Sequence, residues 1–320
     1  MTPKENFVHF LKKEPYEWTP SSLDQLYFHP SMIPDYVARA MVFEQKPFTG
    51  EYGGKDLFGV EWVYVPSVGG SMETGVLSDD ITDWENFVKF PNLDDIDWEG
   101  CARENAEYLK TDKMIHSTIF TGYFERLISF VGFENASMAL IDEDEQECVH
   151  KLFDKLTELY IDEIRRMKKY FNVDIVELHD DWGNQRSLMF SKATHEEMIL
   201  PYIKRVADAA HEMGVLIEQH SCGKIESIVP NIIASGVNTW RGQGSVVDKK
   251  WLVENYGDQF RFGVDVALDE GMTAEQGIAA VQSTLDAYHG KDVWFVLFRP
   301  TLGVELCTEV HDYLKKIGHV

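Results

Sequence analysis

Short apolar segments alternate with amphipathic helical patterns over the C-terminal two thirds of the chain. This alternation is typical of βα units wound around a parallel sheet. Each segment is mostly apolar, as expected of a strand that is buried on both faces. From about residue 112 onward the sequence therefore predicts six strands, at residues 114–120, 173–178, 215–219, 237–240, 260–266 and 293–298.

Helical patterns lie between these strands. Residues 144–170 place apolar side chains on one helical face. Thr194 and Glu197 have the spacing of a capping box, which predicts the start of another helix, and Gly214 marks its end. The first 110 residues are less regular and rich in aromatic, proline and glycine positions, so we expect one or two further strands there.

Six or more βα units in one chain favour closure into a barrel. We predict an α/β fold, a single (β/α)8 TIM barrel spanning residues 1–320 as one domain. Residues 1–110 form an irregular N-terminal extension that covers part of the barrel, and residues 111–320 supply the regular βα units. A doubly wound open sheet is the alternative. In both folds ligands bind at the C-terminal ends of the strands.

The chain has 54 acidic and 30 basic residues, a net charge of −24. Because nucleic acid is bound by a basic face, this charge argues against a nucleic-acid partner. The sequence has no run of about 18 apolar residues for a membrane span and no apolar N-terminal signal. Four cysteines in 320 residues do not make a disulfide scaffold. We expect a cytoplasmic protein with reduced thiols and no membrane partner.

The stretch EQHSCGK, residues 218–224, places three candidate metal ligands at the end of a predicted strand. Glu218, His220 and Cys222 alternate along the strand, so they share one face, which in a barrel is the interior. An imidazole and a thiolate at this spacing suit Zn²⁺, and Cys307 offers a further thiolate. The alternatives are a core histidine beside a buried cysteine and, for Cys307, a buried cysteine at the start of the terminal helix.

A second polar stretch, ELHDDWGNQ at residues 177–185, follows another predicted strand. It brings carboxylates, an imidazole and an amide to the same end of the sheet, at Glu177, His179, Asp180, Asp181 and Gln185. Asp181 is in phase with Glu177 and His179 and should face the mouth, whereas Asp180 should cap the following helix or hold the turn. The alternative interpretation is a local cluster of capping and turn residues.

Longer motifs resemble the uroporphyrinogen decarboxylase superfamily, and within it the corrinoid-linked methyltransferases. They are HSCGK, DDWGNQRSLMFS, YFERL, FVGFENASM and the opening MTPKENF. The region GGKDLFGVEWVYVPSVGGSM looks like the substrate-side methyltransferases of O-demethylase systems. The resemblance covers nearly the whole chain and implies a (β/α)8 barrel with its site at the C-terminal mouth.

The resemblance also implies a zinc site. His220 and Cys222 match the H-x-C pair that holds zinc in relatives. Cys307 does not match the later cysteine cleanly, because that position falls nearer Thr301, and Glu218 is the local substitute. A different pattern described for O-demethylases falls on Glu143, Glu158 and His179. Two glutamates fifteen residues apart on one straight helix are about 22 Å apart, so they cannot share a metal.

The resemblance implies a methyltransferase that demethylates a small methoxylated aromatic compound and passes the methyl group to the Co(I) corrinoid of a partner protein. His179, Asp181 and Glu218 are the catalytic candidates, with zinc or a carboxyl stabilising the phenolate. The substrate-binding candidates are Glu177, Gln185 and a set of aromatic residues that are alternatively core residues: Trp62, Tyr64, Trp182 and Trp240.

Other functions stay open at this point. Zinc with two thiolates would suit a methyl-corrinoid:thiol methyltransferase. A decarboxylase of this superfamily binds a substrate with many carboxylates through an arginine-rich N-terminal segment, whereas the first arginine here is Arg39. The remaining alternative is a non-catalytic protein that binds a corrinoid or another tetrapyrrole.

Overall fold

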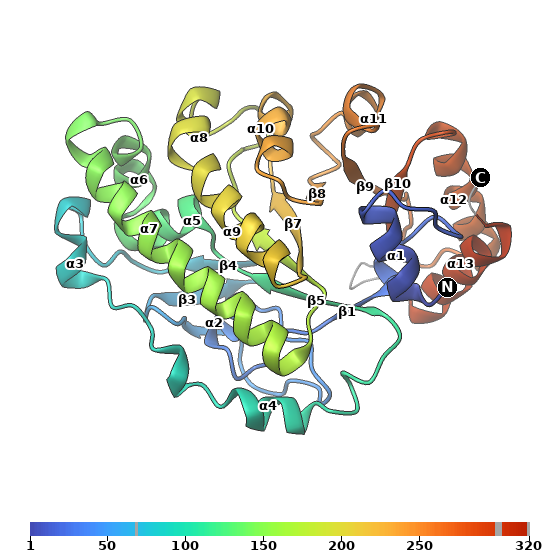
Figure 1. The fold of residues 1–320 in the computed structure, drawn as a ribbon, viewed down its shortest axis with the longest axis horizontal. Helices are drawn as coiled ribbons and strands as arrows, with labels where there is room; N and C mark the ends of the chain where they lie inside the picture. Colours follow the sequence, from blue (N-terminus) through green and yellow to red (C-terminus); the bar gives the residue numbers. More distant parts are fainter. Residues whose placement is uncertain (68–69, 298–302, 319–320) are drawn as a thin grey trace.

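The barrel prediction is confirmed in a computed structural model, which describes residues 1–67, 70–297 and 303–318. Its main sheet is parallel, with the strand order β1-β5-β6-β7-β8-β9-β10 (Figure 1). An isolated parallel bridge joins Ser21, ahead of β1, to Phe295 in β10, and the Phe295 N–H donates to the Pro20 carbonyl at 2.8 Å. The strands are β1 (Gln25–Tyr27), β5 (Met114–Ile119), β6 (Ile175–His179), β7 (Leu216–Ser221), β8 (Thr239–Gly242), β9 (Arg261–Asp265) and β10 (Val293–Val296).

All six predicted strands are present, each with its ends shifted by at most a few residues. The last predicted strand runs on to Phe298, which lies outside the described residues. The number of strands differs from the prediction, because the part of the chain that the structure describes contributes seven to this sheet rather than eight. The other strands of the N-terminal third pair with one another instead, in a separate antiparallel sheet.

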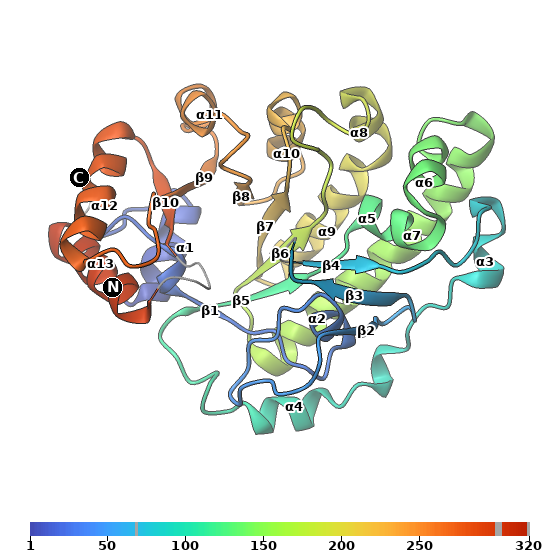
Figure 2. The ribbon, with the colours of Figure 1, turned by 180° about the vertical axis from the view of Figure 1, so that it is seen from behind.

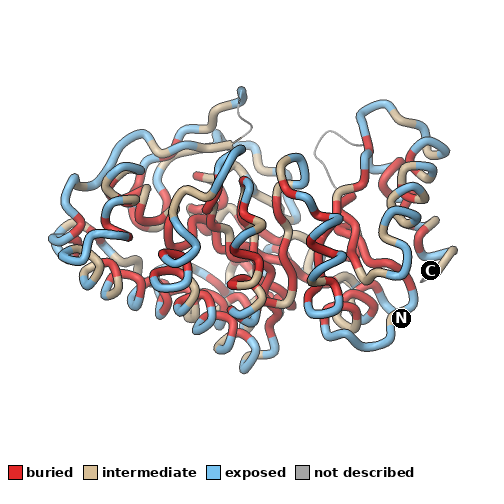
Figure 3. Tube along the Cα trace, turned by 90° about the horizontal axis from the view of Figure 1, so that it is seen from above, coloured by how far each residue is buried: buried red, intermediate tan, exposed pale blue. Residues whose placement is uncertain are grey.

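Helices cover the outside of the sheet, and buried residues concentrate on the strands and on the inner sides of the helices (Figure 3). The long helix α7 follows the predicted pattern and continues into a π-helical turn at Met167–Phe171. None of the helices within the described ranges is long and apolar enough to span a membrane. The helices that follow the barrel strands are α5 (Tyr123–Val131), α6 (Phe133–Ala139), α7 (Glu143–Arg166), α8 (Lys192–Met198), α9 (Leu200–Glu212), α10 (Val229–Ala234), α11 (Lys249–Tyr256), α12 (Ala274–Ala287) and α13 (Val304–Ile317).

The predicted capping box at Thr194 is wrong. Helix α8 starts earlier, because the Ser191 hydroxyl accepts the Thr194 N–H at 3.0 Å and makes Ser191 the N-cap. As the N-cap directly before the helix, Ser191 satisfies the N–H of Thr194, whereas the predicted cap would have satisfied the N–H of Glu197. The end of the pattern is closer to prediction: α9 stops at Glu212, and Gly214 adopts a positive φ of 70°.

One end of the barrel is closed by the N-terminal helix α1 (Pro3–Leu11). The first residues of β5, β6 and β7 point inward and meet apolar side chains of α1. In Figure 1 this helix lies in front of the sheet. The resulting cluster at the amino ends of the strands consists of Phe7, Phe10, Leu11, Met114, Ile175, Leu216, Trp294 and Val296.

The rest of the N-terminal third packs against the barrel from the other side, nearer the viewer in Figure 2. Its core residues join the same apolar cluster as those of the βα units, and the one-domain assignment stays a prediction. It contains α2 (Pro34–Ala38), β2 (Gly53–Lys55), β3 (Glu61–Val65), β4 (Gly70–Glu73), α3 (Trp84–Phe87) and α4 (Trp98–Glu104).

Candidate metal centre and active site

Two histidines stack at the C-terminal ends of β6 and β7. These parallel strands pair in a register that sets His179 beside His220, with Glu177 beside Glu218 one step lower. The two imidazole rings lie 4.6 Å apart between centroids at an angle of 22°. Because alternate residues of a barrel strand point inward, all four side chains enter the barrel interior.

The residues that follow the two strands complete the cluster. The Asp181 carboxylate accepts the backbone N–H of Cys222 at 2.6 Å and lies 3.9 Å from His220 Nε2. The Cys222 sulfur lies 3.4 Å from the same Nε2 atom. His179, Asp181 and His220 each offer a ligand atom, and these atoms lie within 4.8 Å of one another.

This spacing fits a tetrahedral zinc ion. Bonds of about 2.0–2.3 Å to nitrogen, oxygen and sulfur place neighbouring ligand atoms about 3.3–3.8 Å apart. The separations of His220 Nε2 from Cys222 and Asp181, 3.4 and 3.9 Å, are close to that range. The set also mixes imidazole, carboxylate and thiol groups, all of which bind zinc.

A glycine shapes the loop that carries Cys222. Gly223 has a φ of +85°, and a Cβ there would meet the Gly183 carbonyl oxygen at 2.3 Å. Only glycine therefore lets the loop after β7 pack onto the loop after β6. This close approach holds Cys222 and Asp181 against each other.

Glu125, which the sequence did not suggest as a site residue, contacts His179 on the side away from the cluster. Glu125 Oε2 lies 2.9 Å from His179 Nδ1, which leaves Nε2 as the other ring nitrogen. Burial opposes both charges, but Glu125 raises the pKa of His179 to about 9, and Arg39 and His179 lower the pKa of Glu125 to about 2. A carboxylate that orients a histidine in this way is common behind metal ligands.

His220 and Cys222 have pKa values that favour their neutral forms. Burial and the neighbouring His179 lower the pKa of His220 to about 4. Burial and Asp181 raise the pKa of the Cys222 thiol to about 12. A neutral imidazole binds zinc directly, whereas the thiol needs the charge of a cation to become the thiolate ligand.

A second polar layer lies below the mouth, at the middle of the barrel. Arg241 on β8 forms an ion pair with Glu177 and approaches Glu218 at 3.3 Å, and His116 on β5 lies 3.8 Å from Glu218. The side chains of His116, Glu177 and Glu218 are almost fully buried. Within the described structure both Glu218 oxygens and both His116 nitrogens have no hydrogen-bond partner.

The two glutamates of this layer differ in charge. Burial, followed by Glu177, raises the pKa of Glu218 well above its ordinary value. Burial also opposes the charge of Glu177, but Arg241 and then His220 lower its pKa well below the ordinary value. The layer thus contains a charged pair, Glu177 with Arg241, next to Glu218, whose raised pKa favours its protonated form. This places Glu218 under the metal-ligand cluster rather than within it.

A pocket of about 510 Å³ opens at the mouth beside His220. Its volume is in the range of small-molecule sites. Among the described residues no Phe, Tyr or Trp side chain lines it. The lining residues are His220, Arg241, Gly242, Gln243, Gly244, Ser245, Asp265, Val266 and Ala267.

The predicted aromatic residues lie elsewhere. Trp240 is fully buried against Phe262 on the outer face of β8, since its neighbours Thr239 and Arg241 point into the barrel. Trp182 is equally buried and meets His195 edge to face, with the ring centroids 4.5 Å apart. Neither indole contributes to the pocket at the mouth.

Trp62 and Tyr64 belong to β3 in the N-terminal third. Trp62 is buried, and its indole N–H donates to Asp56 at 3.0 Å. Tyr64 is half-buried, with Tyr52 6.2 Å away between ring centroids. The structure thus places Trp62 behind the site, and a role for either residue in substrate binding stays a prediction.

Cys307 is also separated from the cluster. It lies buried on α13, with its sulfur 3.8 Å from the Leu297 carbonyl oxygen. Thr301, where the family cysteine was expected, is outside the described residues. The structure therefore brings together His220 and Cys222 of the predicted metal set, but not Glu218 or Cys307.

The remaining predicted positions fall at the rim and on α7. Gln185 is exposed, and its amide donates to Gln243 at 3.3 Å. Glu143 and Glu158 are both exposed on helix α7, so the helical rise separates them too far for them to share a metal. They do not form a site with His179.

Asp180 and Asp181 point to different partners, as the alternation predicted. Asp180 is buried and accepts the backbone N–H groups of Phe124 and Glu125 at 3.0 and 2.9 Å, so it caps α5. The prediction was that it would cap the following helix or hold the turn. The cap instead belongs to the neighbouring βα unit, because β5 and β6 are adjacent and α5 starts beside the end of β6.

Comparison with known proteins supports the superfamily. Residues 117–256 match the family model Uroporphyrinogen decarboxylase (URO-D). No curated protein sequence matches the chain. Among solved structures the chain is similar to a methyltransferase from Methanosarcina mazei, with a TM-score of 0.72, 14% identity and 99% of each chain covered. It is weakly similar to Old Yellow Enzyme from Pichia sp. AKU4542, with a TM-score of 0.41, 12% identity, and 68% and 66% of the two chains covered.

At 14% identity, the likeness to the methyltransferase shows a shared fold alone. The likeness to Old Yellow Enzyme, with a TM-score of 0.41, is too weak to interpret. The family match over the central βα units, the barrel and the motifs in the sequence point the same way. The match over residues 117–256 and the shared barrel fold support the uroporphyrinogen decarboxylase superfamily.

Proposed function

We propose that the chain is a methyltransferase that removes the methyl group of a methoxylated aromatic compound and passes it to the Co(I) corrinoid of a partner protein. One observation carries the proposal: His179, Asp181, His220 and Cys222 converge beside an open pocket at the mouth of the barrel. The shared fold with the methyltransferase from Methanosarcina mazei supports the same class of reaction.

These four residues would hold zinc. Bound there, the ion supplies a Lewis acid that stabilises negative charge on the oxygen of the substrate. The chain itself orients the ligands through Glu125 on His179 and through the Cys222 N–H on Asp181.

The reaction transfers a methyl cation and needs one proton. The Co(I) of the partner's corrinoid would take up the methyl group as a cation, and the electron pair of the broken carbon–oxygen bond would stay on the oxygen. We assign Glu218 as the proton store, because its carboxyl oxygens have no hydrogen-bond partner in the described structure and it lies directly beneath the mouth. A proton delivered to the ether oxygen as the bond breaks lets the product leave as a neutral phenol, which is a better leaving group than a phenolate.

The pocket itself is polar at one side and apolar at the other. Arg241, Gln243 and Asp265 offer polar groups, and Val266 and Ala267 offer small apolar contacts. A ring bound there would be held by aliphatic side chains and glycine backbone rather than by stacking. Its polar substituents would face Arg241 and Asp265.

The alternative functions have less support. A thiol methyltransferase site with two thiolates would need Cys307, which packs in α13. A decarboxylase would need several arginines for the substrate carboxylates. Among the described residues that line the pocket, Arg241 is the one arginine, and it is already paired with Glu177.

The test uses zinc-loaded protein, cob(I)alamin as methyl acceptor and a panel of methoxyphenols and methoxybenzoates. We expect methylcobalamin and the demethylated phenol to form in equal amounts with at least one compound. Absence of transfer across the panel, from protein with one bound zinc, would count against this function. Carbon dioxide release from the benzoates would instead support a decarboxylase.

A further inference from the structure

Arg39, from the N-terminal extension, reaches the back of the metal-ligand cluster. Its guanidinium donates to Thr121 Oγ1 at 2.7 Å and pairs with Glu125 Oε1 at 3.2 Å. The side chains of Arg39 and Glu125 are only 11% and 17% exposed, so water screens the pair weakly. The contact joins a residue outside the family match to the centre of the site.

Glu125 uses its two carboxylate oxygens in opposite directions. Oε1 pairs with Arg39, and Oε2 lies 2.9 Å from His179 Nδ1. The backbone N–H of Glu125 is fixed by Asp180 at the start of α5. The carboxylate therefore has one orientation that satisfies both partners, and this orientation sets the plane of the His179 ring.

Aromatic rings hold the guanidinium in place. The central carbon of the Arg39 guanidinium lies 4.7 Å from the centroid of Trp62 and 5.7 Å from that of Phe120. Stacking on rings suits the flat guanidinium and would not hold a lysine ammonium in the same way. This gives Trp62 a position behind the metal-ligand cluster.

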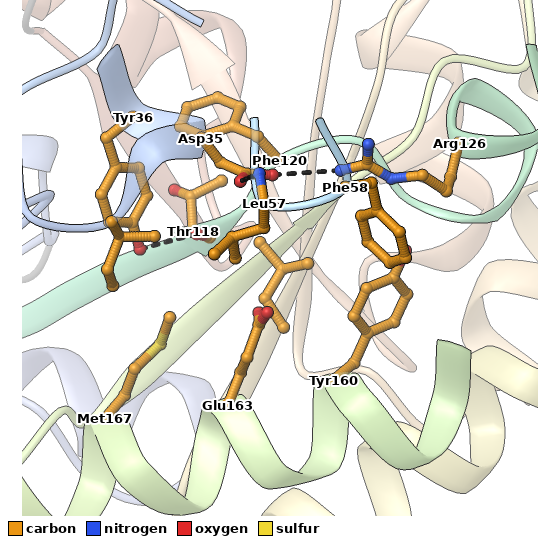
Figure 4. A pocket seen from close by; sticks show the side chains of 12 residues that line it. Asp35, Tyr36, Leu57, Phe58, Thr118, Phe120, Arg126, Tyr160, Glu163 and Met167 are labelled. Carbon is orange, nitrogen blue, oxygen red and sulfur yellow. Dashed lines mark hydrogen bonds and ion pairs between the residues drawn. The ribbon is translucent and has the colours of Figure 1, made fainter. Parts of the chain in front are cut away.

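The segment that carries Arg39 is itself anchored, as Figure 4 shows. Just before it in α2, Asp35 pairs with the buried Arg126 at 3.0 Å, and the Tyr36 hydroxyl donates to the Thr118 carbonyl at 2.9 Å. Arg39 follows directly as the C-cap of α2. Its backbone is therefore fixed independently of its contact with Glu125.

We propose that Arg39 is a positioning residue of the metal centre. It fixes Glu125, and Glu125 in turn presents His179 Nε2 to the metal. The inference rests on the zinc centre of the proposed function. It adds that a residue of the N-terminal extension sets the zinc affinity and ligand geometry of that centre. Outer residues of this kind change metal affinity by about 10–100-fold when they are removed.

The experiment measures metal binding by the whole chain. Zinc affinity is obtained by competition with a chelator, and the Co²⁺-substituted protein gives a visible absorption spectrum that reports ligand geometry. The variants are Arg39→Gln, Arg39→Lys and Glu125→Gln. The matched control is Arg165→Gln, which removes an exposed arginine that pairs with Asp162 on the surface of α7.

We expect Arg39→Gln and Glu125→Gln to weaken zinc binding by about 10–100-fold and to change the Co²⁺ spectrum. Arg39→Lys should not restore the wild-type values, because lysine lacks the planar guanidinium with its several N–H donors. Arg165→Gln should match the wild type. The proposal is overturned if Arg39→Gln lowers only the melting temperature and keeps the zinc affinity and spectrum of the control.

Failure of the proposed function has a different signature. If the wild-type chain binds neither zinc nor Co²⁺, the metal centre is absent and the inference falls with it. If it binds metal but transfers no methyl group, the role of Arg39 is still measured by affinity and spectrum.

Discussion

Among the described residues the barrel contains two clusters of side chains that could bind a metal. The clusters differ in whether an arginine lies beside them. The upper cluster, His179, Asp181 and His220, lies at the mouth, and the lower one, His116, Glu177 and Glu218, is buried beneath it. Both bring three ligand atoms within 4.8 Å of one another. Only the lower cluster contains an arginine, since Arg241 pairs with Glu177 and approaches Glu218.

This difference favours the upper cluster as the proposed metal site. The Arg241 guanidinium already supplies the positive charge that a cation would bring to the two glutamates, and a second cation there would be repelled. At the mouth no arginine or lysine of the described residues pairs with Asp181, and Cys222 adds a thiol. Proximity of ligand atoms alone therefore does not define a metal site, because the charge balance around them decides it.

The largest effect should follow from removing the arginine of the lower cluster. Arg241→Met leaves Glu177 buried without its partner, which costs about 3–5 kcal/mol of unfolding free energy. Urea denaturation measures this cost. Adding Glu177→Gln to Arg241→Met should recover part of the loss, because the uncompensated charge is gone. A single variant as stable as wild type would mean that the pair is not buried as described.

Replacing one histidine of each cluster should change the zinc affinity by very different amounts. We expect His220→Ala to weaken zinc affinity by more than about 100-fold, beyond the loss typical of an outer residue. His116→Ala, which removes a barrel histidine of the lower cluster, should keep the affinity within about threefold of wild type. Chelator competition and metal analysis give both values. The reverse order would move the metal to the lower cluster.

Asp181 and Asp180 offer a comparison between adjacent residues. Asp181→Asn should lower kcat/KM for methyl transfer by roughly 10²-fold, because a group at the mouth loses its charge while the fold persists. Asp180→Asn keeps one acceptor for the two N–H groups at the start of α5 and should cost about 1 kcal/mol of stability. Kinetics and thermal melts of both variants test the division. Equal effects on activity would contradict it.

The smallest effect concerns a carboxyl outside the barrel. Glu163 lines a small cavity with Asp35 and Arg126, and burial, followed by Asp35, raises its pKa from 4.5 to about 8 (Figure 4). The folded chain therefore holds a proton that the unfolded chain releases between these pH values, and stability falls as the pH rises through this window. Glu163→Gln cannot titrate.

At pH 8 we expect the Glu163→Gln variant to be more stable than wild type, with the difference vanishing near pH 4.5. Urea denaturation at both pH values measures it. Since other groups titrate in the same range, the quantity that matters is the difference between variant and wild type. A constant difference at both values would mean that Glu163 keeps its ordinary pKa.

Local patterns in the sequence predicted the barrel strands and part of the site. The strands are apolar because both faces are buried, and the alternation in residues 177–181 and 218–222 placed His179 and His220 correctly inside. The same alternation also applies to β8, where Thr239 and Arg241 flank Trp240. It places Trp240 outside the barrel.

Other parts of the site depend on contacts that no local pattern encodes. Arg39 is 86 positions from Glu125, and Glu125 is 54 from His179. The cap that Asp180 makes on α5 likewise crosses between neighbouring βα units. A signal was available for Arg241 and His116, since a charged residue and a histidine inside apolar strands need partners. It predicts a buried polar layer, but not which residues pair.

The helix α1 that closes the amino end of the barrel has a consequence for the order of events in catalysis. Phe7, Phe10 and Leu11 fill the amino end of the barrel with apolar side chains, among the described residues, and leave the mouth as the end that carries polar groups. In the proposed reaction the methoxylated compound and the corrinoid of the partner would therefore both approach through the mouth, and the phenol would leave by it. We expect an ordered mechanism in which the small substrate enters first, the partner covers it, and product release waits until the partner dissociates.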